Sequence, residues 1–266
     1  LFVRASIGIA MHDGDQLDQE LLRNADTAMY AAKAAGKGRH QVFHPVMHDT
    51  ARRRLQLTGD LRRAGGALLE LCRSHPGVAV TALVLTGGGS LREEEERAAL
   101  AAFCPGAKLD VGVLDLPDGR VPTRWERAKL ALEELRTRGE PDLILAPSPH
   151  DLHQDHRALA ELVPTAFRDH LILGYEILKW DGDLAQPTVF LPLAEPVLRE
   201  KIAKLHEHYG SQRDRSWFDP EVFGGLARVR GVQCHARYAE AFHVAKLVLG
   251  AAPLLGVDLS TPTFPS

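Results

Sequence analysis

Apolar positions along residues 66–167 follow two alternating spacings, which predict a series of strands and helices. Stretches such as VAVTALVLT and PDLILAPSP have the length and branched, apolar composition of buried strands. Between them lie charged stretches such as LREEEERAALAAF, whose apolar residues share one face of a helix. The predicted helices cover residues 66–74, 91–103, 123–139 and 155–167, the last interrupted by Pro164, and the predicted strands cover 78–86, 108–116 and 141–149.

The first part of the chain shows a different pattern. Residues 3–12 alternate in polarity and predict a strand, and residues 17–35 have helical spacing with an apolar stripe that ends at Gly36. The segment HQVFH, residues 40–44, predicts a short strand, and the Arg-rich residues 50–64 predict a basic helix. This part is expected to be a partial α/β unit followed by a helical linker.

The order of helices and strands after residue 65 predicts a Rossmann-like α/β fold. Strands that alternate with helices form a mostly parallel sheet flanked by helices, through right-handed crossovers. Ligands of such sheets bind beyond the carboxyl ends of the strands. Candidate functional residues are therefore sought directly after the predicted strands.

Composition narrows the class of protein. The 266 residues are 45% hydrophobic and 25% charged, with a net charge of −3, as in a soluble globular protein. No apolar run has the length of a membrane span. The net charge is close to zero, so the chain as a whole has no positive electrostatic field that would attract nucleic acid. The three cysteines are too few for a disulfide framework, so a reduced, cytoplasmic compartment is expected.

One segment concentrates residues that carry chemistry. PSPHDLHQDHRAL follows a predicted strand directly and contains three imidazoles and two carboxylates: His150, Asp151, His153, Asp155 and His156. Such groups at a strand's carboxyl end can converge on one cation or on one reacting carbonyl. Asp155 stands where a helix opens, so it can also serve as a helix cap.

Residues 1–46 resemble a known signalling domain. The stretches SIGIA and ADTAMYAAKAAGKGR are similar to the C-terminal end of GGDEF diguanylate cyclase domains. The GG[DE]EF loop that holds the metal and nucleotide in that family is not in this chain. We therefore expect residues 1–46 to be a truncated GGDEF-like fragment without cyclase chemistry, and residues 47–64 to be a basic helical linker.

Residues 65–250 resemble a second family, the PIG-L/LmbE-like zinc-dependent N-acetylglucosaminyl deacetylases. The H-x-D-H motif at a helix start, TALVLTGGG, LDLPDGR, YEILKW and RYAEAF are similar to that family in order and spacing. The resemblance implies zinc-dependent hydrolysis of an N-acetyl group on a sugar-type small molecule. It further implies that His156 binds zinc, that His153 stabilises the oxyanion, that Asp155 orients a neighbouring imidazole and that Arg92 binds substrate.

The sequence departs from this second family at one decisive place. In the family the first strand ends in A-H-P-D-D-E, which supplies further zinc ligands and the general base. Here GGALLEL follows DLRRA directly, so residues 65–250 are expected to lack the first strand, unless the sheet takes SIGIA in its place. The segment around His44 and His48 superficially resembles the missing motif but stands too far from Gly65.

Two functional hypotheses remain open. The first is a deacetylase-family chain whose hydrolysis is impaired or absent, because a catalytic zinc needs about three protein ligands and an open position. The alternative is a non-catalytic signalling or interaction fragment, or a recombined fusion product. Residues 251–266 are expected to form a C-terminal tail in either case.

Overall fold

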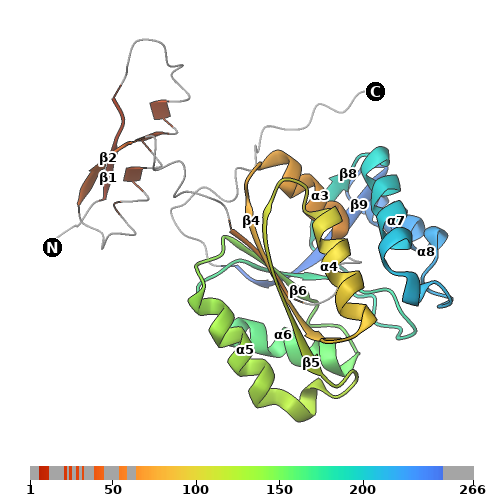
Figure 1. The fold of residues 1–266 in the computed structure, drawn as a ribbon. Coiled ribbons are helices and arrows are strands. Elements are labelled where there is room, and N and C mark those ends of the chain that lie inside the picture. Colours follow the sequence, from red (N-terminus) through yellow and green to blue (C-terminus); the bar gives the residue numbers. More distant parts are fainter. Residues whose placement is uncertain are drawn as a thin grey trace. The chain divides into compact units, whose positions relative to one another are not determined.

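The computed structural model describes residues 6–11, 39–44 and 64–247, the backbone of residues 54–58, and part of one helix between residues 21 and 32. The chain divides into two compact units, Leu1–Arg52 and Arg53–Ser266 (Figure 1). Each unit is described by itself. The predicted tail at residues 251–266 lies outside the described residues.

The first unit contains the predicted strand–helix–strand arrangement. Strand β1 (Ile7–Ile9) pairs in parallel with β2 (His40–Val42), so both predicted strands are confirmed in shortened form. The described residues of the intervening segment are helical, and Ala28 and Ala32 are completely buried. Positions four residues apart lie on one helix face, which accounts for the buried stripe. The SIGIA segment thus pairs within its own unit.

The second unit is built on a seven-stranded sheet in the order β5-β4-β3-β6-β7-β9-β8. The first five strands of that order are parallel, whereas β9 runs antiparallel to both β7 and β8. The predicted Rossmann-like, mostly parallel sheet is confirmed. The strands are β3 (Arg54–Thr58), β4 (Ala79–Thr86), β5 (Lys108–Leu116), β6 (Leu143–Pro147), β7 (Ile172–Tyr175), β8 (Val189–Leu193) and β9 (Tyr238–Lys246).

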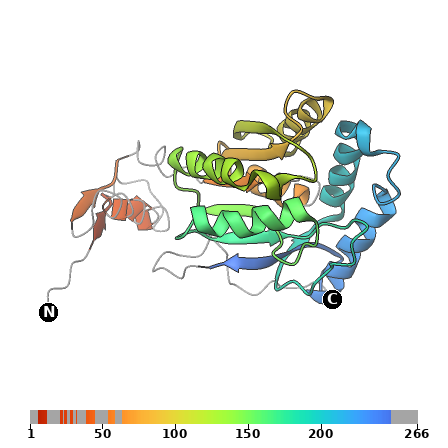
Figure 2. The ribbon, with the colours of Figure 1, turned by 90° about the horizontal axis from the view of Figure 1, so that it is seen from below.

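Helices cover both faces of this sheet. Helices α5 and α6 pack together on one face, while α3, α4 and α7 lie on the other, and α8 packs against α7 (Figures 1 and 2). The helices are α3 (Gly65–Ser74), α4 (Leu91–Phe103), α5 (Trp125–Thr137), α6 (Gln154–Ala166), α7 (Glu195–His208) and α8 (Pro220–Gln233). Helix α6 runs through Pro164 without a break, contrary to the prediction. Within the described part of the chain, no helix is both long and apolar enough to cross a membrane.

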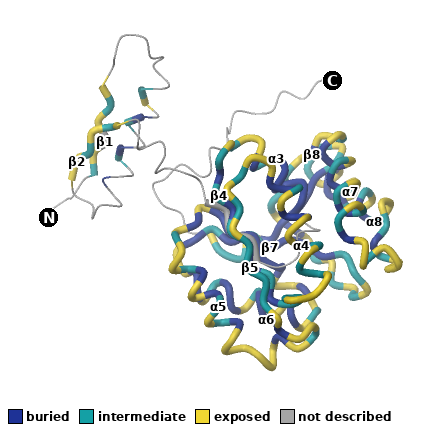
Figure 3. Tube along the Cα trace, in the orientation of Figure 1, coloured by how far each residue is buried: buried dark blue, intermediate teal, exposed yellow. Residues whose placement is uncertain are grey.

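Two apolar clusters form the core, one on each face of the sheet. Leu68, Leu100 and Phe103 belong to the cluster under α3 and α4, and Leu132 and Leu162 belong to the cluster under α5 and α6. All five side chains are essentially inaccessible to solvent, and every residue of β6 is buried. In Figure 3, buried residues lie mainly in the interior of the unit and exposed residues on its outer turns. Burial of such side chains is the main stabilising contribution to a fold of this kind.

The most important difference from prediction concerns residues 54–58. The sequence predicts that this segment belongs to a basic helix and that the sheet lacks its first strand. Instead Arg54–Thr58 forms β3, which stands between β4 and β6 at the centre of the sheet. A central strand needs only its backbone N–H and C=O groups to pair on both sides, and this segment supplies them. The chain therefore completes the sheet although it lacks the H-P-D-D motif.

The start of α3 is fixed by a residue from the far end of the unit. Helix α3 has no side-chain N-cap of its own, because Ala64 stands at that position. The buried Glu240 carboxylate on β9 accepts hydrogen bonds from the backbone N–H of Gly66, at 2.8 Å, and of Ala67, at 2.7 Å. Lys201 Nζ on α7 donates to the same carboxylate at 2.7 Å. A carboxylate satisfies the free N–H groups of the first helical turn and interacts favourably with the helix dipole.

Candidate active site

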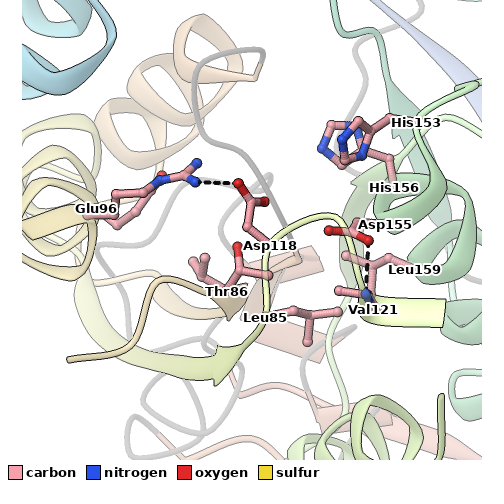
Figure 4. Close-up of a pocket in the computed structure, with 11 residues that line it drawn as sticks. Leu85, Thr86, Glu96, Asp118, Val121, His153, Asp155, His156 and Leu159 are labelled. Atoms are coloured by element: carbon pink, nitrogen blue, oxygen red, sulfur yellow. Dashed lines mark hydrogen bonds and ion pairs between the residues drawn. The ribbon is translucent and has the colours of Figure 1, made fainter. Parts of the chain in front are cut away.

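A pocket opens at the carboxyl ends of β4, β5 and β6, at the edge of the sheet where a ligand is expected. Its volume is about 80 Å³, and its lining includes Arg92, His153, Asp155 and His156 (Figure 4). All four residues singled out from the sequence thus lie around one pocket. Thr86, at the end of β4, and Asp118, after β5, complete its wall.

The loop between β6 and α6 places the two imidazoles side by side. His153 is the N-cap residue of α6, and His156 lies in the first turn of this helix. Their ring centroids are 4.6 Å apart, and both rings face the same side of the pocket in Figure 4. His153 Nδ1 is buried and has no hydrogen-bond partner among the residues that the structure describes. An unpaired buried ring nitrogen is costly and is uncommon in folded proteins.

Asp151 orients the second imidazole from behind. Its Oδ2 lies 3.0 Å from His156 Nδ1, and its side chain is only 2% exposed. Since a carboxylate only accepts, His156 Nδ1 carries a proton and donates it in a hydrogen bond to Asp151. The same carboxylate accepts a hydrogen bond from the backbone N–H of His153 at 2.8 Å. One residue therefore holds both imidazoles in place.

A buried lysine keeps this carboxylate in its anionic form. Lys179 Nζ lies 2.9 Å from Asp151 Oδ1 and also contacts Asp183, and its side chain is 8% exposed. Burial by itself would raise the pKa of Asp151, but the hydrogen bonds from His156 and Lys179 outweigh burial and hold the pKa below its ordinary value. Asp151 is thus a fixed negative charge beneath the imidazoles.

The first imidazole is in a different electrostatic state. Burial lowers the pKa of His153, and the neighbouring His156 lowers it further, against the opposing charges of Asp155 and Asp151. The neutral form of His153 is therefore favoured in the folded protein. A neutral imidazole can donate or accept one hydrogen bond at each ring nitrogen, according to its tautomer.

Asp155 binds backbone N–H groups, whereas the family resemblance implies that it orients an imidazole. Its two carboxylate oxygens accept hydrogen bonds from the backbone N–H of Gly119, at 2.7 Å, and of Val121, at 2.9 Å. These bonds tie the first turn of α6 to the loop that follows β5. The imidazole of His156 is oriented by Asp151 instead of Asp155, because the Asp155 oxygens are turned towards Val121 (Figure 4).

Arg92 reaches the pocket from the opposite wall. The turn between β4 and α4 uses positive φ angles at Gly87 and Gly89, which favour glycine, and Ser90 Oγ caps the helix by accepting from Arg92 N at 3.3 Å. Arg92 thereby stands in the first turn of α4. Its guanidinium donates to Asp118 Oδ2 at 3.1 Å. This exposed pair presents one cationic and one anionic group to the pocket.

The described residues do not assemble a complete metal site. Among them, no group of three or more His, Cys, Asp or Glu side chains is arranged to hold a metal ion. His156 and His153 alone fall short of the three protein ligands that a catalytic zinc needs. Of the other pair considered, His44 belongs to the first unit and His48 lies outside the described residues. The donor set of the described residues thus does not fit a catalytic zinc.

Two residues of the site escaped the sequence analysis. Asp118 lies in LDLPDGR and Lys179 in YEILKW, both segments noted only for their overall similarity. Their polarity directly after apolar stretches was the available signal. That Lys179 contacts Asp151 follows only from the pairing of β6 with β7, which brings the loops after these strands together.

The fold and the site together define a Rossmann-like α/β protein with a histidine–carboxylate cluster at the carboxyl edge of its sheet. Within this class, residues 62–167 match the sequence model of the PIG-L family, described as GlcNAc-PI de-N-acetylase. These residues therefore form a PIG-L segment, which confirms the resemblance inferred from the sequence.

Solved structures, deacetylases among them, share this fold. N,N'-diacetylchitobiose deacetylase from Pyrococcus horikoshii is 17% identical with a TM-score of 0.56, over 88% of this chain and 94% of that one. A conserved protein from Thermus thermophilus is 21% identical with a TM-score of 0.57, over 74% and 96%. The A40926 pseudoaglycone deacetylase Dbv21 is 15% identical with a TM-score of 0.55, over 72% and 96%.

Curated relatives support the GGDEF-like assignment of the N-terminal part. The bifunctional diguanylate cyclase/cyclic di-GMP phosphodiesterase MucR of Pseudomonas aeruginosa is 48% identical over 63 residues, which are 23% of this chain and 9% of that protein. An uncharacterized signaling protein of Caulobacter vibrioides is 39% identical over 64 residues, 24% of this chain and 8% of its own length. The chain thus spans less than a tenth of either relative.

Proposed function

We propose that residues 53–266 bind an N-acetylated sugar-type molecule in the pocket between Arg92 and the two imidazoles, and that hydrolysis of its N-acetyl group is impaired. The observation that carries this proposal is the convergence of Arg92, His153 and His156 on one pocket at the carboxyl edge of the sheet. The PIG-L segment and the fold shared with a diacetylchitobiose deacetylase and a pseudoaglycone deacetylase support the substrate class.

Each predicted site residue has a role in this proposal. Arg92, paired with Asp118, donates hydrogen bonds to hydroxyl groups of the sugar. His153, in the neutral form that its lowered pKa favours, donates from its other ring nitrogen, Nε2, to the carbonyl oxygen of the acetyl group. His156 is the residue that would bind zinc in a complete site, held by Asp151, and Asp155 holds the α6 end of the pocket.

The proposed impairment follows from the donors that the chain offers. The family places two zinc ligands and the general base after its first strand, in H-P-D-D. At that place this chain reads T-G-D-L, residues 58–61, directly after the body of β3. Of the four residues, only Asp60 matches the motif, so its histidine and one of its two aspartates are absent from this segment. A site without them is short of the groups that bind zinc and activate its water.

Restoring the motif tests this proposal. The triple variant Thr58→His, Gly59→Pro, Leu61→Asp, which keeps Asp60, reads H-P-D-D. We expect less than stoichiometric zinc and no acetate release from N-acetylglucosamine in the wild-type protein, and a gain of both in the triple variant. His156→Ala in the triple variant should abolish zinc binding. Stoichiometric zinc together with acetate release in the wild-type protein would contradict the impairment.

Binding is measured separately from hydrolysis. Calorimetric titration of the wild-type protein with N-acetylglucosamine should show saturable binding that Arg92→Ala weakens at least about tenfold, because a charged hydrogen bond contributes about 1.5–3 kcal/mol. Arg199→Ala, an exposed arginine on α7, is the matched control and should leave affinity unchanged. No binding to the wild-type protein would overturn the proposed function.

A second candidate is a non-catalytic signalling or interaction fragment. The 48% identity with a cyclic di-GMP enzyme over 63 residues favours it, because these residues, 23% of the chain, resemble part of a signalling protein. All three cysteines are free thiols, which fits the proposed cytoplasmic location. Binding of a signalling nucleotide together with absence of sugar binding would favour this candidate over the first.

A further inference from the structure

A long loop without helix or strand follows β7. It covers residues 176–188 and ends where β8 begins, and we call it the β7–β8 loop. Loops of this length inside a compact unit are uncommon and usually have a function. Because the loop has no ladder of backbone hydrogen bonds, its shape depends on side chains that bind its backbone and its charged groups. Those side chains therefore determine where Lys179, the partner of Asp151, is placed.

One buried arginine of α8 binds both ends of this loop. Arg230 Nε donates to Glu176 Oε2 at 2.8 Å, and a second guanidinium nitrogen pairs with the other carboxylate oxygen. The same second nitrogen donates to the backbone oxygen of Ala185 at 3.1 Å. Both side chains of the ion pair are 6% exposed. A guanidinium carries five N–H donors in a rigid plane, so Arg230 can fix the two ends of the loop relative to each other.

The end of α8 that carries Arg230 is itself packed closely. A Cβ at the next residue, Gly231, would lie 2.6 Å from the backbone oxygen of Arg237, so glycine permits this close approach. Gln233, the last residue of α8, accepts from Arg230 at 2.9 Å and donates to Gln186 at 3.1 Å. The donors that Arg230 directs at the β7–β8 loop thus start from a well-supported helix end.

The middle of the β7–β8 loop contacts the loop that carries the imidazoles. Lys179 Nζ lies 2.9 Å from Asp151 Oδ1 and also pairs with Asp183. Asp183 Oδ2 accepts a hydrogen bond from the backbone N–H of Leu152 at 2.8 Å, and Asp151 accepts from that of His153 at 2.8 Å. The two carboxylates are only 2% and 3% exposed. An unbroken series of polar contacts therefore runs from α8 to the candidate active site.

We propose that Arg230 is a positioning residue for the two imidazoles, His153 and His156. By binding Glu176 and Ala185, it holds the β7–β8 loop in the shape that places its middle against the loop between β6 and α6. Arg230 is not among the residues that line the pocket, so it acts through the β7–β8 loop. This inference rests on the proposed function for its effect on sugar binding, and it extends that function to a residue of α8.

Amide hydrogen exchange of the 266-residue chain, followed by NMR, tests the positioning role. The backbone N–H groups of Leu152 and His153 report on it, because their acceptors are the two buried carboxylates. We expect Arg230→Met to speed the exchange of both amides at least about tenfold, the usual consequence of losing a charged hydrogen bond. Arg230→Lys should give an intermediate rate, because an ammonium can pair with Glu176 but lacks the rigid fork that binds both ends.

Three further variants separate positioning from a general loss of stability. Arg228→Met removes another arginine of α8, which donates to the backbone just after this helix, and should leave both rates unchanged. Val80→Ala removes part of a completely buried side chain of β4 and lowers global stability. It should also leave both rates unchanged, because loop amides exchange through local opening. The double variant Glu176→Met/Arg230→Met leaves no buried charge unpaired and should still speed the exchange.

Calorimetric titration with N-acetylglucosamine measures the effect on the pocket. Arg230→Met should weaken the affinity at least about twofold, because apparent affinity falls with the fraction of molecules in the binding-competent arrangement. Arg228→Met and Val80→Ala should bind as the wild-type protein does. A role of Arg230 in stability alone predicts no such difference between the variants.

Each other result overturns a defined statement. Unchanged exchange of both amides in folded Arg230→Met and in the double variant, or acceleration spread equally over the unit, would overturn the positioning role and leave the proposed function standing. Faster exchange with unchanged sugar affinity would also overturn it, because the loop would then be ordered without effect on the imidazoles. Absence of sugar binding by the wild-type protein would overturn the proposed function, whereas the exchange rates would still decide whether Arg230 holds the loop.

Discussion

A single aspartate connects most of the chemistry of the candidate site. Asp151 is inaccessible to solvent, accepts from His156 and from the His153 backbone, and pairs with Lys179. Its neighbour Asp155, by contrast, serves the backbone of the loop at Gly119. Two carboxylates four residues apart in the sequence thus have different partners: Asp151 contacts His156, and Asp155 binds the backbone of the loop in the pocket wall.

Neutralising Asp151 should destabilise the second unit. Asp151→Asn keeps the shape but removes the negative charge between Lys179 and His156; because Lys179 keeps its contact with Asp183, we expect a cost of about 1–3 kcal/mol. Asp118→Asn, whose side chain is 68% exposed, is the control and should cost less than about 1 kcal/mol. Urea unfolding followed by circular dichroism measures both changes. Equal small effects would show that Asp151 is dispensable.

A buried histidine should make stability depend on pH. Burial, and then the neighbouring His150 and Arg230, lower the pKa of His243, whose residue is 6% exposed. Because the unfolded chain protonates this group near pH 6.5 and the folded protein does so only at lower pH, stability should fall as pH drops below about 6.5. Well above that pH, His243 is neutral in both states and does not make the free energy of unfolding depend on pH.

The variant His243→Gln isolates this contribution. The difference in unfolding free energy between wild type and variant should be constant from about pH 7 to 8 and should shift in favour of the variant as pH falls through about 6.5. Glu176, which also lies close to Arg230, titrates in both proteins and cancels in the difference. A difference that does not vary with pH would contradict the assignment.

At the scale of elements, α3 depends on a strand far from it in the sequence. Its first N–H groups donate to Glu240 on β9, and the same carboxylate pairs with Lys201 on α7. The helix also approaches this carboxylate so closely that a Cβ at Gly66 would lie 2.7 Å from Glu240 Oε1 and 2.7 Å from Leu193 Cδ1. Glycine at this position permits the contact.

Two glycine substitutions should therefore act in opposite directions. Gly66→Ala should destabilise the protein by about 1–3 kcal/mol, since the added methyl group displaces Glu240 or Leu193. Gly224→Ala, in the interior of α8 with open space around it, should stabilise by up to about 1 kcal/mol through helix propensity. Midpoints of urea unfolding for both variants measure the effects. Destabilisation by Gly224→Ala, or none by Gly66→Ala, would contradict this account of α3.

At the scale of the whole molecule, the boundary between the two units differs from the predicted start of the deacetylase-like domain. The second unit begins at Arg53, twelve residues before Gly65, and this added stretch contains the central strand β3. Without β3, the inner edges of β4 and β6 would each expose a row of unpaired backbone groups. The second unit therefore has a complete sheet only when the residues of β3 belong to it.

Two fragments distinguish these boundaries. A fragment of residues 53–247 should fold and unfold cooperatively, because it contains every strand of the large sheet. A fragment of residues 65–247 should aggregate or lack a cooperative transition. Size-exclusion chromatography and thermal unfolding followed by circular dichroism compare the two. A monomeric, cooperatively folding 65–247 fragment would show that β3 is not required.

Much of the fold and part of the site could be predicted from the sequence. Periodicity located the strands and helices between residues 78 and 167, and the family motif pointed to His153, His156 and Arg92, which the structure brings to one pocket. These features follow from local pattern and from short motifs. They depend little on which strands are neighbours.

The remainder depends on contacts between distant segments. Lys179 reaches Asp151 only because β6 and β7 are paired, which no local pattern shows. The arginines around residues 54–58 favour a helix in the prediction, although Leu55 and Leu57 alternate with polar residues as in a strand. Five residues are too short a stretch for this alternation to outweigh the charged flanks. Pairing with β4 and β6 in the folded sheet therefore outweighs the local preference of this segment for a helix.

The central position of β3 also has a consequence for how such genes change. A β-ladder recognises main-chain groups, which are the same in nearly all amino acids, whereas a catalytic motif depends on the identity of a few side chains. Recombination between coding segments can therefore replace the sequence at the heart of a sheet, leave the architecture whole and erase its chemistry in the same event. For genome interpretation, an intact scaffold is a poor guide to whether an encoded enzyme still turns over its substrate.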